Sequence, residues 1–354
     1  MISMKFIFVK KESAESSRKH LIESKILAEG IKAIREEERI GFPVSAEKEE
    51  AARELFNKNN ILFTEEDIEA ESKKSPRSIE ELLSAKLGDK TLFLKKSFDV
   101  IGDIAIIEGS EELKRYEKDI AEAIMKINGH IKSVYIKSDV HQGEYRIQPI
   151  KYVLGEERTE TVHHENGYRI FLDVEKTYFS PRLSGERRRI AEMISLGEDI
   201  LVLFSGVGPY GLAAAKLSDA KSIVCVELNE NAHEHALINI EKNHIKNMSC
   251  VCADAREECK KLALSGRKFN RIIMPLPRLA HTFLKDAITV AKEGAIIHLY
   301  QFSPEEEIEV NIHSIVKEAI GGLCEYEIKH IEKAGQYAPG KYRVCADIII
   351  NNIG

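Results

Sequence analysis

The residues best suited to ligand chemistry stand at the ends of three apolar segments of this chain. After DILVLF comes S-G-V-G-P, where Gly206 and Gly208 allow a tight turn and a close approach of the backbone to a ligand. Glu227 follows SIVCV, and Asp254 follows MSCVCA. A carboxylate after the second strand of a nucleotide-binding fold accepts hydrogen bonds from ribose hydroxyls, and Asp254 is placed to reach an adenine edge. Together these stretches predict a site for an adenosine-containing cofactor.

The spacing of the glycines narrows the choice of cofactor. A dinucleotide site requires a third glycine at a fixed distance, and here Gly211 stands at an irregular one. The chain has no G-x-x-x-x-G-K-[ST] motif, which disfavours a nucleoside triphosphate. The order F-S-G-V-G-P, acid, D-A and M-P-L-P instead resembles the pattern of S-adenosylmethionine (AdoMet) methyltransferases.

Alternating segments in the C-terminal half must position these residues. Each apolar strand-like run is followed by a helix-like run, and this alternation predicts an α/β fold with a doubly wound, Rossmann-like parallel sheet. The expected helices span 184–194, 210–218, 230–244, 255–264 and 280–292, and the expected strands span 199–206, 222–228, 248–254, 269–277 and 295–302.

Two smaller α+β domains are expected before this fold. Residues 1–66 combine a strand at 5–10 with helices at 13–30 and 46–57, and the polar stretch 66–80 suits a linker. Short strands around a helix at 111–127 follow in the second domain. The predicted domains therefore span 1–66, 67–176 and 177–354.

The composition limits the class of protein. With 354 residues, 43% of them hydrophobic and a net charge of -6, the chain suits a folded protein without a bulk positive field. No apolar run is long enough to span a membrane, so we expect a soluble, cytoplasmic protein. The six cysteines, all in the second half, lack zinc spacing, and no metal site is predicted.

One string gives a more specific indication. The segment YFSPRLSGERRRIAEMI at 178–194, with the glycine loop and RIIMPLPRLAHTFL, strongly resembles the archaeal and eukaryotic tRNA guanine-37 N1-methyltransferases. The resemblance also covers VIGDIAIIEGS, GEYRIQPI, ETVHHENGYRIFLDV and YAPGKYRVCADIII, and is weakest before about residue 80. It implies AdoMet as cofactor and, as partner, a tRNA held at its anticodon loop and outer corner. We expect the protein to be a monomer.

The resemblance also implies roles for individual residues. Guanine N1 carries a proton at neutral pH, so its methylation needs a general base, and negative charge then develops on O6. The base maps to Glu186 and the O6 stabiliser to Arg146 in GEYRIQ. The implied cofactor contacts are Arg187, Phe204, Gly206, Gly208, Pro209, Glu227, Leu228, Asp254, Ala255 and Pro275, and the implied substrate contacts are Tyr178, Arg182 and Pro277.

Several of these residues have a simpler structural interpretation. The arginines at 182 and 187–189 could form a solvated helix start, but four cations in eight residues favour contact with phosphate or cofactor, and Arg187 suits the methionyl carboxylate of AdoMet. His163 and His164 are interpreted as turn and strand residues.

Two positions depart from the family pattern. Val202 stands where the family has an Asp, and Pro275 stands where it has the Asn of N-L-P, although Pro277 is kept. A proline offers neither an amide side chain nor a backbone N–H. These changes leave open a bifunctional N1-guanine and C7-wyosine-intermediate methyltransferase, an aminocarboxypropyl transferase at the same tRNA position, or a catalytically weak tRNA-binding homologue. A small-molecule methyltransferase would leave the N-terminal 180 residues without a use.

Overall fold

The computed structural model describes residues 2–28, 30–70, 78–94, 98–138 and 148–353. It consists of two compact units, Met1–Leu82 and Leu83–Gly354. Each is described separately.

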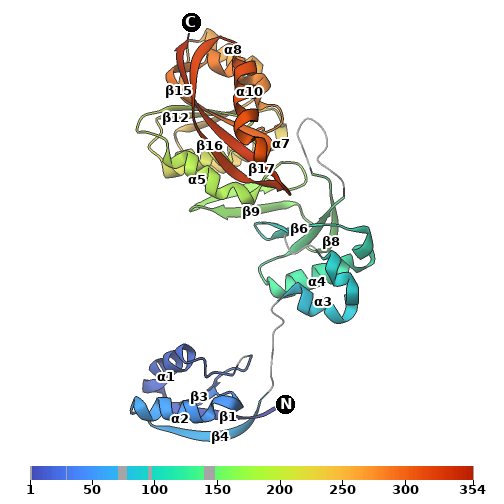
Figure 1. Cartoon of the computed structure of the whole chain (residues 1–354), viewed down its shortest axis with the longest axis vertical. Coiled ribbons are helices and arrows are strands. Elements are labelled where there is room, and N and C mark those ends of the chain that lie inside the picture. The colour runs from blue at the N-terminus through green and yellow to red at the C-terminus, as the bar shows by residue number, and fades with distance from the viewer. Residues whose placement is uncertain (1, 29, 71–77, 95–97, 139–147, 354) are drawn as a thin grey trace. The chain divides into compact units, whose positions relative to one another are not determined.

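The N-terminal unit is an antiparallel sheet covered on one face by two helices (Figure 1). Its strands have the order β2-β3-β1-β4. Ile7 and Val9 of β1 pack with Leu21 and Phe56 from the two helices, and Phe6 and Phe8, which point to the other face of the strand, are buried as well. The elements are β1 (Ile2–Lys10), α1 (Lys11–Glu23), β2 (Ile34–Arg35), β3 (Arg39–Pro43), α2 (Glu49–Lys58) and β4 (Phe63–Ala70).

Two elements of this unit differ from the expectations. The helix α1 ends at Glu23, whereas the sequence favoured a helix to residue 30, and a short strand contact between Leu27 and Val44 follows it. The strand β4 runs through the expected domain boundary at 66 and pairs with β1 along its whole length. The polar residues from 66 onward had suggested a linker, but in β4 they belong to an edge strand, where Glu66 pairs with Arg39 of β3 and Asp67 pairs with Lys5 of β1.

The second unit begins with a small mixed sheet of the order β5-β6-β7-β8. The helix α4 buries Ile120, Ala121 and Ile124 on one face, with Ile124 four residues after Ile120 and three after Ala121. The elements are α3 (Ile79–Leu87, which spans the division between the units), β5 (Asp99–Ile101), β6 (Ile104–Glu108), α4 (Glu117–Ile127), β7 (Ser133–Lys137) and β8 (Ile150–Gly155).

The hairpin of β9 (Glu160–Glu165) and β10 (Tyr168–Asp173) is fixed to the helix α7 (Glu230–Lys242) by two buried asparagines. The Asn239 amide accepts from Phe171 N–H at 2.7 Å and donates to Phe171 C=O at 3.0 Å. Asn243 does the same at Arg169, at 2.9 and 2.7 Å. These four hydrogen bonds attach the hairpin to the C-terminal fold, although the predicted boundary lay at residue 176.

A seven-stranded sheet with the order β13-β12-β11-β14-β15-β17-β16 forms the C-terminal fold. The first five strands are parallel, and β17 and β16 continue the sheet antiparallel. The strands are β11 (Asp199–Leu203), β12 (Ser222–Glu227), β13 (Met248–Cys252), β14 (Phe269–Met274), β15 (Ala291–Pro304), β16 (Cys324–Ala338) and β17 (Lys341–Ile353).

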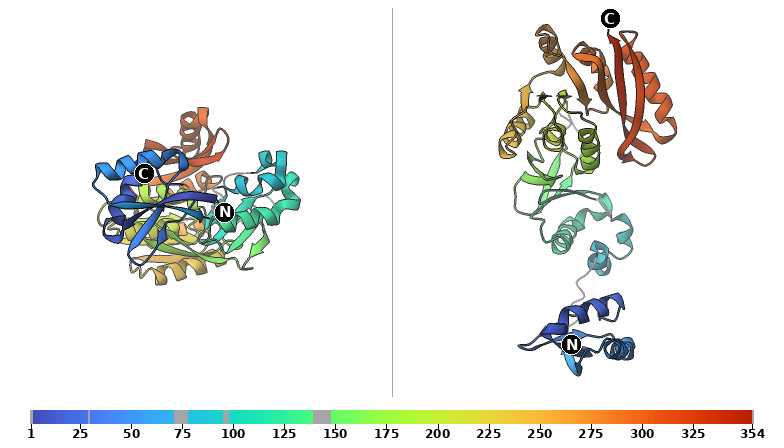
Figure 2. Two further views of the ribbon diagram at one scale, coloured as in Figure 1. Left: turned by 90° about the horizontal axis from the view of Figure 1, so that it is seen from below. Right: turned by 90° about the vertical axis from the view of Figure 1, so that its left-hand side faces the viewer.

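Helices cover both faces of this sheet (Figure 2). Ile200 and Val202 of β11 face the cluster that includes α5 and α6, whereas Leu201 and Leu203 face the cluster that includes α8, α9 and α10. Both faces of the strand are therefore buried, which explains its unbroken apolar run. The helices are α5 (Ser184–Glu192), α6 (Pro209–Leu217), α8 (Ala255–Leu264), α9 (Leu284–Thr289) and α10 (Ile308–Ile320).

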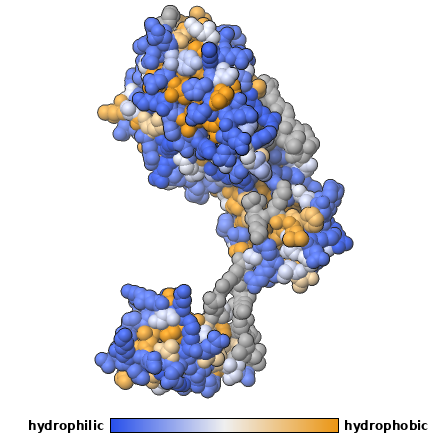
Figure 3. Space-filling view, in the orientation of Figure 1, coloured by the Kyte–Doolittle hydropathy of each residue, from blue (hydrophilic) through white to orange (hydrophobic). Residues whose placement is uncertain are grey.

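The prediction of a Rossmann-like sheet preceded by smaller α+β parts is confirmed. The expected helix 280–292 is divided into a 3₁₀ turn at Ala280–Phe283 and the short helix α9, and β15 already begins at Ala291. Hydrophilic residues cover most of the face shown in Figure 3. Within the described part of the chain, none of the helices has both the length and the apolar character that a membrane crossing requires.

Candidate active site

The glycine loop between β11 and α6 has the backbone conformation that the sequence suggested. Gly206 and Gly208 have φ values of 56° and 84°, in the left-handed region, and Phe204 also has a positive φ of 56°. Pro209 is the first residue of α6, where its fixed φ suits the helix and its missing N–H costs nothing. The loop therefore turns tightly at the carboxyl end of β11, where ligands bind in such sheets.

Glu227 stands at the end of β12 and faces this loop. Its carboxylate accepts from Gly206 N–H at 2.6 Å and from Asn229 N–H at 2.9 Å. Burial raises the pKa of Glu227, and the backbone hydrogen bonds oppose that rise. Leu228 follows it and is half-buried. Within the described residues, the donors that hold this carboxylate are backbone N–H groups, and it stands in the position from which a carboxylate binds a ribose.

Asp254, after β13, is the N-cap of α8. Its side chain accepts from Arg256 N–H at 2.8 Å and from Glu257 N–H at 3.3 Å, while Ala255 is buried as the first residue of the helix. The sequence placed Asp254 at an adenine edge, and the structure adds this capping role.

Glu186 is in the first turn of α5 and is 7% exposed. Its Oε1 accepts from the Tyr300 hydroxyl at 2.6 Å, and Arg189 donates from Nε to Oε2 at 2.8 Å and from Nη2 to Oε1 at 2.9 Å. The Tyr300 ring contacts the Tyr210 ring in α6 at a centroid distance of 5.7 Å. The carboxylate is therefore linked by packing to the helix that starts at the glycine loop.

Arg187 has a different environment from the one expected. The side chain is 2% exposed, and its guanidinium forms two hydrogen bonds with the carboxylate of Glu165 and one with Ser180 C=O, the last at 3.1 Å. Tyr168 also donates to Glu165, at 2.7 Å. A methionyl carboxylate would have to compete with Glu165 for this guanidinium, so the geometry favours a role in fixing α5 to β9.

The expected substrate residues lie around the same fold. The Tyr178 hydroxyl accepts from Arg343 at 2.9 Å, and Arg182 is exposed and pairs with Asp99 at 2.8 Å. Pro275 directly follows β14, and Pro277 is buried two residues later. Arg146, the expected O6 stabiliser, lies outside the described residues.

Val202, where the family has an acid, is fully buried in β11 among apolar side chains. The Nδ1 of His163 accepts from Gly102 N–H at 3.2 Å, and burial lowers the pKa of this imidazole. His163 thus connects β9 to the turn between β5 and β6, in agreement with its interpretation as a strand residue.

Sequence reasoning missed the residues around Glu186. Tyr300 and His298 come from β15 and Asp347 from β17, and all three are at most 2% exposed. The available signal was the presence of polar residues within apolar strands, in AIIHLYQF and VCADIII, because a buried polar side chain requires a partner.

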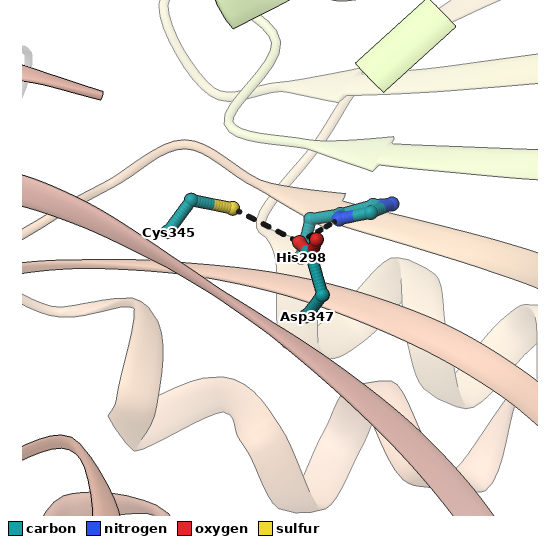
Figure 4. A group of neighbouring side chains, drawn as sticks. All are labelled: His298, Cys345 and Asp347. Carbon is teal, nitrogen blue, oxygen red and sulfur yellow. Dashed lines mark hydrogen bonds and ion pairs between the residues drawn. The ribbon is translucent and has the colours of Figure 1, made fainter. Parts of the chain in front are cut away.

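His298, Cys345 and Asp347 have the ligand types of a metal site and lie close together (Figure 4). Their donor atoms are already engaged, however. Nε2 of His298 is 2.7 Å from Nη1 of Arg271, and Asp347 accepts from Arg189 at 2.8 Å. Two guanidinium groups beside these atoms make a cation unfavourable there.

The parallel sheet, the glycine loop and the acids after successive strands define a Rossmann-like AdoMet methyltransferase fold. The family description "TRM5/TYW2 methyltransferase domain" matches residues 161–328, and "TYW2 N-terminal domain" matches residues 79–159. The chain belongs to the TRM5/TYW2 methyltransferase family, and the predicted resemblance is confirmed.

Similar proteins cover nearly the whole chain. The tRNA (guanine(37)-N(1))-methyltransferase Trm5b of Pyrococcus abyssi is 35% identical over 96% of this chain and 97% of its own length. The structure described as the complex of aTrm5 and tRNALeu has a TM-score of 0.77 and 31% identity, and covers 98% of this chain and 99% of that one.

Two further relatives show the range of the family. The tRNA (guanine(37)-N(1))/4-demethylwyosine(37)-methyltransferase Taw22 of Nanoarchaeum equitans is 30% identical over 72% of this chain and 99% of its own length. The structure of Pyrococcus horikoshii TYW2 in complex with MeSAdo has a TM-score of 0.63 and 28% identity, and covers 77% of this chain and 98% of that one.

Proposed function

We propose that this protein transfers the methyl group of AdoMet to N1 of guanine 37 in tRNA. The observation that carries the proposal is the position of Glu186, a buried carboxylate held by Tyr300 beside the helix that starts at the glycine loop. N1 methylation requires a base of this kind, because the N1 proton must leave before its lone pair can attack.

The proposed reaction begins when the flipped guanine lies beside Glu186. The carboxylate takes the N1 proton, the N1 lone pair forms a bond to the methyl carbon, and the bond from that carbon to the AdoMet sulfur breaks. The products are N1-methylguanosine and S-adenosylhomocysteine, and the proton on Glu186 then passes to water. We assign Arg146 to the negative charge that develops on O6, and Tyr178 to the face of the flipped base.

We place the cofactor along the carboxyl ends of β11, β12 and β13. Glu227 would accept from the ribose hydroxyls, exchanging its bond to Gly206 N–H for bonds to the ligand. Asp254 and Ala255 lie at the N-terminus of α8, close to where an adenine edge would sit. Phe204, Pro209, Leu228 and Pro275 complete the proposed contacts.

Further assignments rest on the same resemblance. We propose that residues 1–66 engage the outer corner of tRNA, that residues 67–176 hold the anticodon side, and that residues 177–354 catalyse. Arg182 and Pro277 are proposed to contact the substrate. The enzyme is proposed to act as a monomer in the cytoplasm.

The decisive experiment is incubation of the purified chain with methyl-labelled AdoMet and an unmodified tRNA transcript that carries guanine 37, followed by nucleoside mass spectrometry. Labelled N1-methylguanosine should form, and a transcript with adenine 37 should give none. A chain that binds both ligands but forms no product would contradict the proposal.

One observation favours a second candidate activity. Pro275 occupies the position where the family has an asparagine, so this loop lacks an amide that could read the Watson–Crick edge of guanine. The second candidate is methylation of C7 of a tricyclic wyosine intermediate at position 37. A tRNA that carries the intermediate would then accept label, and Pro275→Asn would shift product formation toward N1-methylguanosine on the unmodified transcript.

A further inference from the structure

Arg189 lies between two buried carboxylates on different elements. On one side it forms the two hydrogen bonds to Glu186 in its own helix α5. On the other side its Nη1 donates to Oδ2 of Asp347 in β17 at 2.8 Å, with a longer contact of 3.4 Å from Nη2 to Oδ1. The exposed fractions of the Glu186 and Asp347 side chains are 4% and 2%. One guanidinium is thus shared by two acids that water scarcely reaches.

His298, which is neutral, forms a hydrogen bond with Asp347. Burial lowers the pKa of His298, and its bond to Asp347 only partly opposes this effect. Nε2 of the ring faces the Nη1 donor of Arg271 at 2.7 Å, so the remaining proton is on Nδ1 and is donated to Asp347 at 2.6 Å (Figure 4). Arg271 itself pairs with Glu198 at 2.7 Å. The pair of Arg271 and Glu198 therefore adds no net charge.

The charge of the group as a whole follows from these pairs. The other titratable side chains that face Arg189, Asp347 and Glu186 are Tyr300 from β15, Tyr210 from α6 and Cys345 from β17, and burial raises the pKa of all three. They remain neutral near pH 7. Among the described residues in this group, Arg189 is the one cation bonded to both carboxylates, and the group keeps one uncompensated negative charge.

We propose that Asp347, fixed by His298, is a positioning residue that draws part of the charge of Arg189 away from Glu186 and so keeps Glu186 basic enough to accept the guanine N1 proton. An arginine paired with Glu186 alone would stabilise its ionised form fully and weaken it as a base. This inference rests on the proposed role of Glu186 as the general base.

The first test is the pH dependence of single-turnover methyl transfer to guanine-37 tRNA by the full chain. In Asp347→Asn the whole charge of Arg189 acts on Glu186, which makes the carboxylate harder to protonate. The acid limb of the rate profile should move down by about one pH unit, while the plateau rate falls by up to about tenfold. AdoMet affinity should stay unchanged.

The second variant predicts the opposite shift. Arg189→Gln removes the shared cation, so Glu186 becomes easier to protonate and the acid limb should move up by about one pH unit or more. Cys345→Ala, on the same strand as Asp347, removes a weak thiol contact of 3.5 Å but no charge, and should leave the limb in place. Asp347→Glu restores the charge and should return the limb toward its original position.

The outcomes separate this inference from the function on which it rests. If Glu186→Gln leaves the rate of methyl transfer unchanged, the assignment of the base fails. If Glu186→Gln removes activity but the acid limb does not move in Asp347→Asn and Arg189→Gln, the inference alone is overturned. Should Asp347→Asn not fold, as judged by thermal unfolding, the upward shift in Arg189→Gln decides, and its absence refutes the proposal.

Discussion

Two pairs of carboxylates lie in the catalytic fold, and they are held in different ways. Glu227 and Asp254, at the ends of parallel strands, accept hydrogen bonds from backbone N–H groups of the described residues. Glu186 in α5 and Asp347 in β17 accept from side chains, with Arg189 between them. A backbone-held acid can exchange one neutral donor for a ligand hydroxyl, whereas the readiness of an acid in an ion pair to accept a proton depends on the charges beside it. The first pair suits binding and the second suits proton transfer.

The largest effect is expected at Glu186. Glu186→Gln keeps the shape of the side chain but removes the proton acceptor, so the rate of methyl transfer should fall by roughly 10²–10⁴. AdoMet affinity, measured by calorimetry, should change little, because the cofactor is assigned to the other pair of acids. A large loss of affinity would mean that Glu186 is a binding residue and would remove the contrast between the two pairs.

A smaller effect is expected at Glu227. Glu227→Gln weakens charge-assisted bonds to the ribose, and AdoMet affinity should fall by about 10- to 100-fold. Because the pKa of Glu227 is raised above its usual value, the carboxylate protonates at a higher pH than an ordinary Glu. The affinity of the unmodified chain should therefore fall as pH drops toward 5, and that of Glu227→Gln should not.

Glu230→Gln is the matched control, because Glu230 is exposed at the start of α7. Its affinity for AdoMet should follow that of the unmodified chain at every pH. Equal losses in both variants would show a general effect of charge at this edge of the sheet.

Substitution of Gly208 tests how far the proposed AdoMet site depends on the shape of the backbone. Gly208 has a φ of 84°, and an added Cβ would lie 3.0 Å from the Met248 methyl. Gly208→Ala should lower the free energy of unfolding by about 1–2 kcal/mol, measured in urea, with a loss of AdoMet affinity. Gly129→Ala, where an added Cβ meets nothing within 4 Å, should be close to neutral.

The smallest effect is expected at His298, which donates a hydrogen bond to Asp347. The lowered pKa of His298 means that the unfolded chain binds a proton below about pH 6.5 while the folded chain does not. The free energy of unfolding should therefore decrease as pH falls through this range, by at most about 1.4 kcal/mol per pH unit. His298→Asn should make that slope shallower, whereas His313→Asn, at an exposed position, should leave it as it is. Equal slopes in all three proteins would place the titration elsewhere.

The glycine loop and the backbone-held acids were easier to predict from the sequence than the group around Arg189. Gly206, Gly208, Glu227 and Asp254 stand where the sequence put them, because an apolar run, a glycine turn and an acid are local signals. The group around Arg189 depends on Asp347, which is 158 residues away in the sequence. Asp347 lies on an antiparallel strand, which the βα alternation does not predict. Arg187 shows the same limit, since its partner Glu165 is fixed only by tertiary packing.

The two asparagines that fix the hairpin to α7 bear on how such chains evolve. Asn239 and Asn243 bind the backbone of β10, so they tolerate changes in its side chains. The hairpin begins at Glu160. The match to the N-terminal domain ends at residue 159, and the match to the methyltransferase domain begins at residue 161. A boundary between the two domains at that point keeps the hairpin with the C-terminal fold. Exchange of the segment before residue 160 between relatives would keep these four backbone hydrogen bonds, whereas the bonds from the turn between β5 and β6 to His163 and Thr161 would have to form again.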